Sequence, residues 1–136
     1  MMSEEVSKFR LYVLRTLYLL ILVALGSDVW PTVIHPQKLL APLPGVAFSF
    51  WAALSAMGAL GIRYPLKMLP VLILQLFYKS IWLLAVALPL WSAGQFDSAA
   101  AEMTKVFVGG VVVDLLAIPW PYVLANYVKK PGDRWR

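Results

Sequence analysis

The chain has 136 residues, of which 61% are apolar and 14% charged, and its mean hydropathy is +0.75. A soluble domain carries about 25% charged residues, so this composition excludes a protein with an ordinary water-facing surface. The net charge of +5 comes from cations in short segments between apolar runs, a pattern typical of membrane topology signals and not of a nucleic-acid surface. No cysteine is present, which excludes disulfides, thiolate metal sites and thiol redox chemistry.

The first apolar run predicts a membrane helix over residues 11–30, with Arg15 near one end and Asp28 near the other. A long arginine can extend to the interface, and Asp28 can reach outer water. The same stretch also has the features of a secretory signal, because basic residues precede it and residues 24–26 form a small-x-small site. Three further apolar runs follow, so we favour a retained helix over a cleaved signal.

The second predicted helix, residues 46–62, is at the short end of the range of about 17–25 residues that span a bilayer. It is rich in small residues: Ala47, Ser49, Ala52, Ala53, Ser55, Ala56, Gly58, Ala59 and Gly61. Small residues let helix backbones approach closely in lipid. This helix is therefore either the close-packed centre of a bundle or a face for self-association. The proline-rich stretch before it, residues 31–44, predicts a stiff, non-helical connection.

The third and fourth predicted helices are residues 68–91 and 106–128. Pro70 fits a first helical turn, and Pro89 is expected to close or bend the third helix. Pro119 and Pro121 lie inside the fourth helix and predict a kink there. The alanine-rich residues 98–103 are able to extend this helix outward.

The basic residues predict that both termini are cytoplasmic. With the N-terminus inside, nine cations lie on the cytoplasmic side: Lys8, Arg10, Arg15, Arg63, Lys67, Lys129, Lys130, Arg134 and Arg136. Lys38 and Lys105 fall on the far side. Aromatic residues near the predicted interfaces are Trp30, Trp91, Tyr12, Tyr64, Tyr122 and Tyr127, whereas Trp51, Tyr78 and Trp82 lie deeper. The first set is typical of an interfacial belt; the second either packs between helices or lines a pocket.

Lys79 and Asp114 lie near the middle of the third and fourth apolar runs. An ionisable group in hydrocarbon costs about 2.5–3.5 kcal/mol on insertion scales, so such a residue usually faces a partner or a wet cavity. Gln75 lies one helical turn before Lys79, Trp82 is spaced to offer a cation–π contact, and Gly110 precedes Asp114 by one turn. We therefore predict a polar seam of Gln75, Lys79 and Asp114, with a direct contact between the two charges.

Three interpretations of the seam remain open. The pair neutralises itself and fixes helix register, or Asp114 carries a proton or cation while Lys79 balances it. In the third, the pair anchors the polar end of an amphipathic molecule between helices. The candidate ligand- or ion-binding residues are Gln75, Lys79, Trp82, Gly110 and Asp114. No catalytic residues, metal site or cofactor are predicted, and the single histidine, His35, is expected to be a solvated or capping loop residue.

The sequence argues against one class of small membrane proteins. Small multidrug-resistance transporters carry a glutamate within the first helix, whereas residues 18–25 contain no carboxylate. The chain resembles the DoxX-like group of small bacterial four-helix membrane proteins in its layout and in several segments. These segments are Gly61-Ile62-Arg63-Tyr64-Pro65, Phe77-Tyr78-Lys79, Ala87-Leu88-Pro89-Leu90-Trp91 and the tail from Lys130 to Arg136. The resemblance implies an antiparallel bundle, often in an accessory or partner-associated protein.

The sequence thus predicts an all-α membrane protein, a single domain over residues 1–136, folded as an antiparallel four-transmembrane-helix bundle in the bacterial inner membrane. The expected function is non-enzymatic: binding of a lipid-like ligand or a membrane partner through the polar seam. The alternative is a proton-coupled transporter or channel that uses Asp114 and Lys79. The expected partners are the bilayer and a second copy or another membrane protein at the small residues of the second helix, with no nucleic acid.

Overall fold

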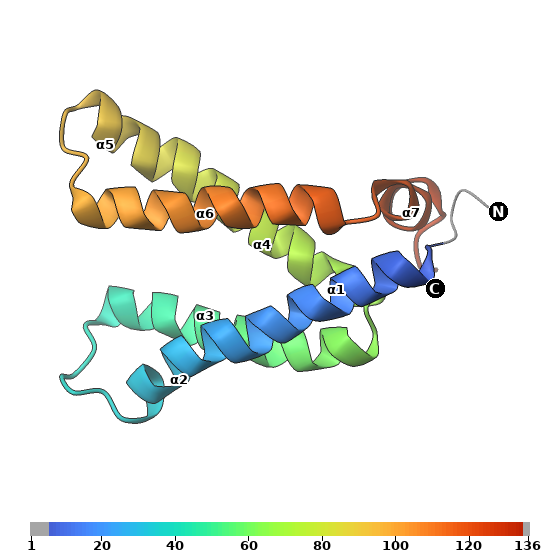
Figure 1. Ribbon diagram of the computed structural model, residues 1–136, viewed down its shortest axis with the longest axis horizontal. Helices are drawn as coiled ribbons and strands as arrows, with labels where there is room; N and C mark the ends of the chain where they lie inside the picture. The colour runs from blue at the N-terminus through green and yellow to red at the C-terminus, as the bar shows by residue number, and fades with distance from the viewer. Residues whose placement is uncertain (1–5, 135–136) are drawn as a thin grey trace. The chain divides into compact units, whose positions relative to one another are not determined.

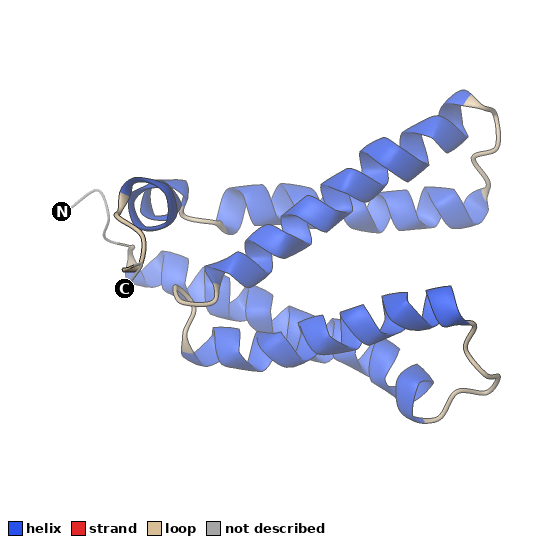
Figure 2. Cartoon of the chain, turned by 180° about the vertical axis from the view of Figure 1, so that it is seen from behind, coloured by secondary structure: helices blue, strands red, loops and turns tan. Residues whose placement is uncertain are grey.

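The computed structural model describes residues 6–134, and all regular secondary structure in this range is helical (Figures 1 and 2). Three continuous helical segments are long and apolar enough to cross a membrane, and a bent pair of helices makes a fourth if it counts as one span. The expected all-helical membrane protein agrees with this result. Trp135 and Arg136 lie outside the described residues. Both belong to the tail segment of the DoxX-like resemblance, and Arg136 was counted among the cytoplasmic cations. The chain divides into two compact units, and the boundary in the sequence lies between Leu69 and Pro70.

The first unit begins with one long helical segment of 27 residues. It consists of α1 (Lys8–Leu20), a π-helical stretch η2 (Ile21–Leu25) and α2 (Gly26–Ile34). The Ser7 hydroxyl caps α1 by accepting a hydrogen bond of 3.1 Å from the backbone N–H of Arg10. The predicted bounds, 11–30, were too short at both ends, because the helix continues beyond its most apolar part.

The second helix of this unit, α3 (Pro42–Arg63), has 22 residues. Pro42 occupies its first turn, where a missing N–H leaves no hydrogen bond unmade. Pro31 lies inside α2, close to its end, and removes only one bond from the ladder. The predicted non-helical connection over 31–44 was therefore too long, since its prolines mostly lie in helix ends and only residues 35–41 are non-helical.

Tyr18 of α1 fits into a notch formed by two glycines of α3. Its side chain is 0% exposed, and its hydroxyl donates a buried hydrogen bond of 2.9 Å to the Pro65 carbonyl. A Cβ atom on Gly61 would overlap the Tyr18 ring, and one on Gly58 would lie 2.7 Å from the Tyr18 carbonyl oxygen. Small residues of α3 thus serve packing inside the unit, as the close-packed interpretation of this helix predicts.

Two further side chains join these helices. Arg15 donates from Nε to the carbonyl of Ile62 at 2.9 Å, so a cation lies at the carbonyl end of α3. The Trp30 indole donates to Ser55 Oγ at 2.8 Å. Arg15 and Trp30 were predicted as interfacial residues, but each also has a specific partner in α3. Some other small residues of α3, including Ala53, Ala56 and Ala59, are exposed.

The second unit contains a helical hairpin. Its first arm consists of α4 (Leu69–Trp82), the π-helical stretch η3 (Leu83–Ala87) and α5 (Leu88–Ser92), 24 residues in all. Gly94 ends the arm in a left-handed conformation, φ 74°, and the N–H groups of Gly94 and Gln95 bond back to Trp91 and Leu90. The second arm, α6 (Ser98–Ala117), begins where Asp97 accepts a bond of 2.8 Å from Ala100 N–H. It runs back along the first arm and contacts η3 (Figure 1).

The chain turns sharply after α6. A helical segment made of α7 (Trp120–Val123) and η4 (Leu124–Lys129) follows, and its axis is bent by 73° from that of α6 (Figure 1). Pro119 cannot donate to the Leu115 carbonyl, and the Trp120 indole replaces the missing donor at 2.9 Å. The predicted kink is confirmed, but the predicted single helix over 106–128 was wrong, because α6 starts at Ser98 and the prolines end it at Ala117.

Candidate functional site

Two helices of the second unit contribute the polar residues that the sequence singled out. On α4, Gln75 and Lys79 are four residues apart and share the buried face with Leu72. On α6, Phe107 and Asp114 are buried seven residues apart, with Gly110 between them. Helical spacing of three, four or seven residues places each set on one face of its helix. The predicted residues Gln75, Lys79 and Asp114 are therefore buried, although the surrounding positions are apolar.

Lys79 lies across α6. Its side chain is 9% exposed, and its ammonium Nζ lies 5.7 Å from the centroid of the Phe107 ring. A Cβ atom on Gly110 would be 2.5 Å from Nζ and 3.2 Å from Cδ, whereas nothing lies within 4 Å of a Cβ on Gly109. Gly110 was predicted to admit a neighbouring helix or a ligand beside Asp114. The structure shows that it admits the lysine side chain.

Asp114 is the second ionisable residue of the site. Its side chain is 0% exposed, and neither carboxylate oxygen has a hydrogen-bond partner. The predicted direct contact with Lys79 is therefore not made as a hydrogen bond, although the two charges lie within electrostatic range of each other. Gln75 is 7% exposed, and its Oε1 atom likewise has no partner. Buried acceptors without donors are rare in proteins, and each calls for an explanation.

An aromatic cluster holds one side of the site. The Phe107 ring makes edge-to-face contacts with Trp82 and Tyr78, with centroids 5.0 and 5.7 Å apart. Trp82 was predicted as the cation–π partner of Lys79, but the ring under the ammonium is Phe107, and Trp82 supports that ring. Phe107 was not predicted, because one phenylalanine in an apolar run has no distinguishing signal. Its spacing of seven residues from Asp114 was the available clue.

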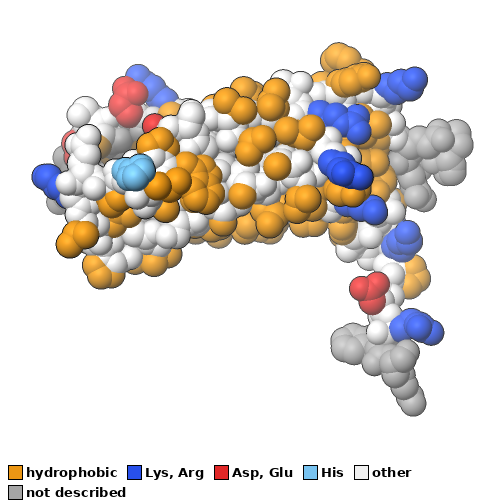
Figure 3. All heavy atoms as spheres, turned by 90° about the horizontal axis from the view of Figure 1, so that it is seen from below, with side chains coloured by type: hydrophobic (Ala, Val, Ile, Leu, Met, Phe, Trp, Pro, Cys, Tyr) orange, Lys and Arg blue, Asp and Glu red, His pale blue; other side chains and the backbone are white. Residues whose placement is uncertain are grey.

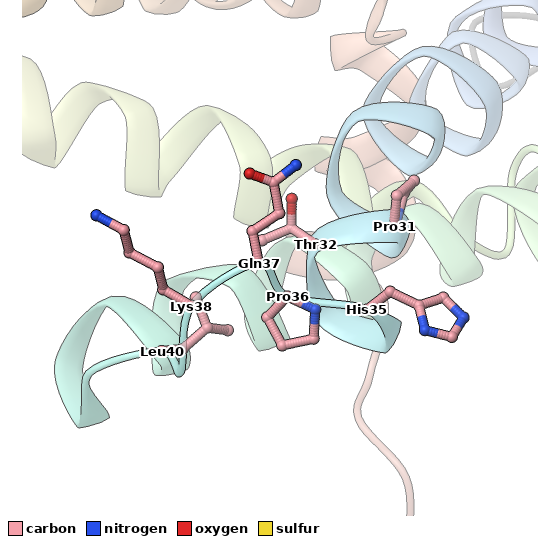
Figure 4. A pocket seen from close by; sticks show the side chains of 7 residues that line it. All are labelled: Pro31, Thr32, His35, Pro36, Gln37, Lys38 and Leu40. Carbon is pink, nitrogen blue, oxygen red and sulfur yellow. The ribbon is translucent and has the colours of Figure 1, made fainter.

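A concavity lies in the first unit, at the loop between α2 and α3 (Figure 4). It has a volume of about 390 Å³, and its lining residues are Pro31, Thr32, His35, Pro36, Gln37, Lys38 and Leu40. In Figure 4 the His35 imidazole and the Lys38 ammonium point in opposite directions. The backbone N–H of His35 bonds the Pro31 carbonyl at the end of α2. These polar groups do not converge on one point, so the loop offers no built ligand site.

No group of three or more His, Asp or Glu side chains within residues 6–134 is arranged to hold a metal ion. Comparisons of the chain with protein-family models, with curated proteins and with solved structures find no match. The resemblance to DoxX-like proteins is thus left as a prediction from the sequence. Any functional assignment depends on the chemistry of the site itself.

Proposed function

We propose that this protein binds the polar end of a lipid-like molecule between α4 and α6, without catalysing a reaction. In this proposal Asp114 accepts a hydrogen bond from a hydroxyl or ammonium group of the ligand. Lys79 lies beside an anionic group of the same ligand, and Gln75 contributes an acceptor. Phe107, supported by Trp82 and Tyr78, provides an apolar wall next to the ligand's chain.

The observation that supports this proposal is the buried carboxylate of Asp114, which has no donor among the described residues. A buried acceptor left unsatisfied costs about 1–3 kcal/mol, and more when it is charged. In hydrocarbon no bulk water compensates for that loss. A ligand with an N–H or O–H group would satisfy the carboxylate, and a phosphate in the same ligand would suit the nearby ammonium of Lys79.

The proposal extends to the setting of the protein. We infer a multi-pass protein of the bacterial cytoplasmic membrane, related to the DoxX-like group, with both termini cytoplasmic and four spans packed as one antiparallel bundle. The excess of lysine and arginine on one side of the apolar runs supports this orientation. The exposed small residues of α3 leave a surface where a second copy or another membrane protein could pack.

Native mass spectrometry of the detergent-purified protein tests ligand binding. Phosphatidylethanolamine has both an N–H donor and a phosphate, whereas phosphatidylcholine lacks the donor. We expect retained phosphatidylethanolamine adducts on the wild type, weaker retention of phosphatidylcholine, and loss of the preference in Asp114→Leu. Because that change leaves the buried ammonium of Lys79 without a nearby opposite charge, thermal unfolding should show lower stability, and lipid adducts are compared on the folded protein. The matched control, Asp28→Asn, removes an exposed carboxylate elsewhere and should retain the preference.

Equal retention of both lipids by wild type and Asp114→Leu would contradict the proposal. The same unpartnered carboxylate also suits a proton carrier, which is the second candidate function. A pH gradient across reconstituted vesicles separates the two. A carrier would show proton flux that Asp114→Asn abolishes, whereas a lipid-binding protein would show none above empty vesicles.

A further inference from the structure

The end of the chain contains a surface that the proposed ligand site does not use. The first arm of the hairpin, Leu69–Ser92, has 24 residues and α6 has 20. At a rise of about 1.5 Å per residue, these helices are about 36 Å and 30 Å long. Because α6 runs back along the first arm, the bend at Pro119 lies within about two helical turns of the level at which α4 begins. In the sequence, Lys67 comes just before α4. A cation next to the first apolar turn of a helix is expected at a membrane interface.

The segment after the bend has one exposed apolar face. Leu124 is 48% and Val128 68% exposed, and Pro121 is exposed on the same side at helical spacing. Val123 is 7% exposed, so another face of the segment is buried. Three aromatic residues, Trp120, Tyr122 and Tyr127, lie in the same ten residues, which is the composition of the headgroup region.

Basic residues follow this apolar face directly. Lys129, Lys130 and Arg134 are exposed, with Asp133 as the acidic residue among them. Figure 3 shows basic side chains, with an acidic side chain among them, on the narrow projection at the lower right of that view. A helix with an apolar face and adjacent cations, lying across the axis of a spanning helix, has the features of an interfacial helix. Cations next to a membrane attract anionic lipids, with roughly fivefold tighter binding for each lysine or arginine.

We propose that Trp120–Lys129 lies in the plane of the membrane surface and, together with the basic residues up to Arg134, binds anionic lipid headgroups. Pro121, Leu124 and Val128 face the acyl chains, while the cations face phosphates. In this arrangement α6 alone is the fourth span. Glu102 and Lys105, both about three-quarters exposed in its first turns, extend their charged ends to outer water.

Single-cysteine labelling tests the orientation, since the chain has no cysteine of its own. Leu124→Cys, Val128→Cys and the mid-α6 control Val108→Cys, which replaces an exposed residue, are labelled with a nitroxide in reconstituted vesicles. Depth is measured by collision with oxygen and with a water-soluble nickel complex. A segment in the plane places the labels at 124 and 128 at similar shallow depths and the label at 108 near the bilayer centre.

Two results would overturn the orientation. A continuous span would separate the labels at 124 and 128 by about 6 Å in depth, and a re-entrant segment would place both in hydrocarbon.

Vesicles of phosphatidylcholine, with and without phosphatidylglycerol, test the lipid partner. We expect phosphatidylglycerol to lower the nickel accessibility of the label at 128 severalfold, and high salt to reverse the effect. Replacing Lys129, Lys130 and Arg134 together with glutamine should remove this dependence. The control Lys38→Gln, in the loop before α3, should not. A label that responds equally in both vesicles would overturn anionic lipid as the partner.

Discussion

At the scale of single residues, Gly110 decides where the lysine side chain can lie. A methyl group there would occupy the space of Lys79 Nζ, 2.5 Å from the position of a Cβ, whereas the space next to Gly109 is open. The two glycines are consecutive on one helix, so they provide a matched pair of variants that differ chiefly in their distance from the lysine.

We predict that Gly110→Ala displaces Lys79 from Phe107 and lowers lipid retention severalfold, while Gly109→Ala leaves retention unchanged. Gly109→Ala should also raise stability by about 0.5–1 kcal/mol, because alanine is the better helix former. Native mass spectrometry and thermal unfolding of both variants check this prediction. Equal effects of the two variants would mean that the Lys79 position does not matter for binding.

At the scale of helices, the contact between α1 and α3 depends on Tyr18 and its glycine notch. Tyr18→Phe keeps the ring and removes the hydroxyl that bonds the Pro65 carbonyl, and it should destabilise the chain by about 1 kcal/mol. Gly58→Ala should cost more, because the groups it meets, the carbonyl of Tyr18 and the N–H of Leu22, are backbone atoms. Chemical unfolding in detergent measures both, with Gly45→Ala as a control whose nearest neighbour is 3.7 Å away.

The sequence predicted these helices well, because long apolar runs report burial in lipid directly. It also located Lys79 and Asp114, since an ionisable residue stands out in such a run. Tyr18 did not stand out, because its partner is a backbone carbonyl 47 residues away. Phe107 was hidden for a related reason: its role depends on which helix faces it. The sequence did not predict where α6 ends, because Pro119 and Pro121 can each break a helix and the tertiary structure decides between them.

At the scale of the whole molecule, the proposed topology places residues 35–41 and 93–97 on the same side of the membrane and the tail on the other. We predict that cysteines at Gln37 and Gln95 react with a membrane-impermeant maleimide added outside intact cells. A cysteine at Asp133 should react only after the cells are opened. Labelling of all three from outside, or of only one of the two loops, would contradict the proposed arrangement of four spans.

The hydrogen bond between Tyr18 and Pro65 has a consequence for biosynthesis. The unit that contains it, Val6–Leu69, is continuous in sequence, so both partners of this bond are synthesised before the second helical hairpin. The bond to the Pro65 carbonyl can form only after Pro65 has been synthesised, 47 residues after Tyr18. We therefore expect the α1–α2 segment and α3 to pack against each other while the ribosome is still synthesising the second unit.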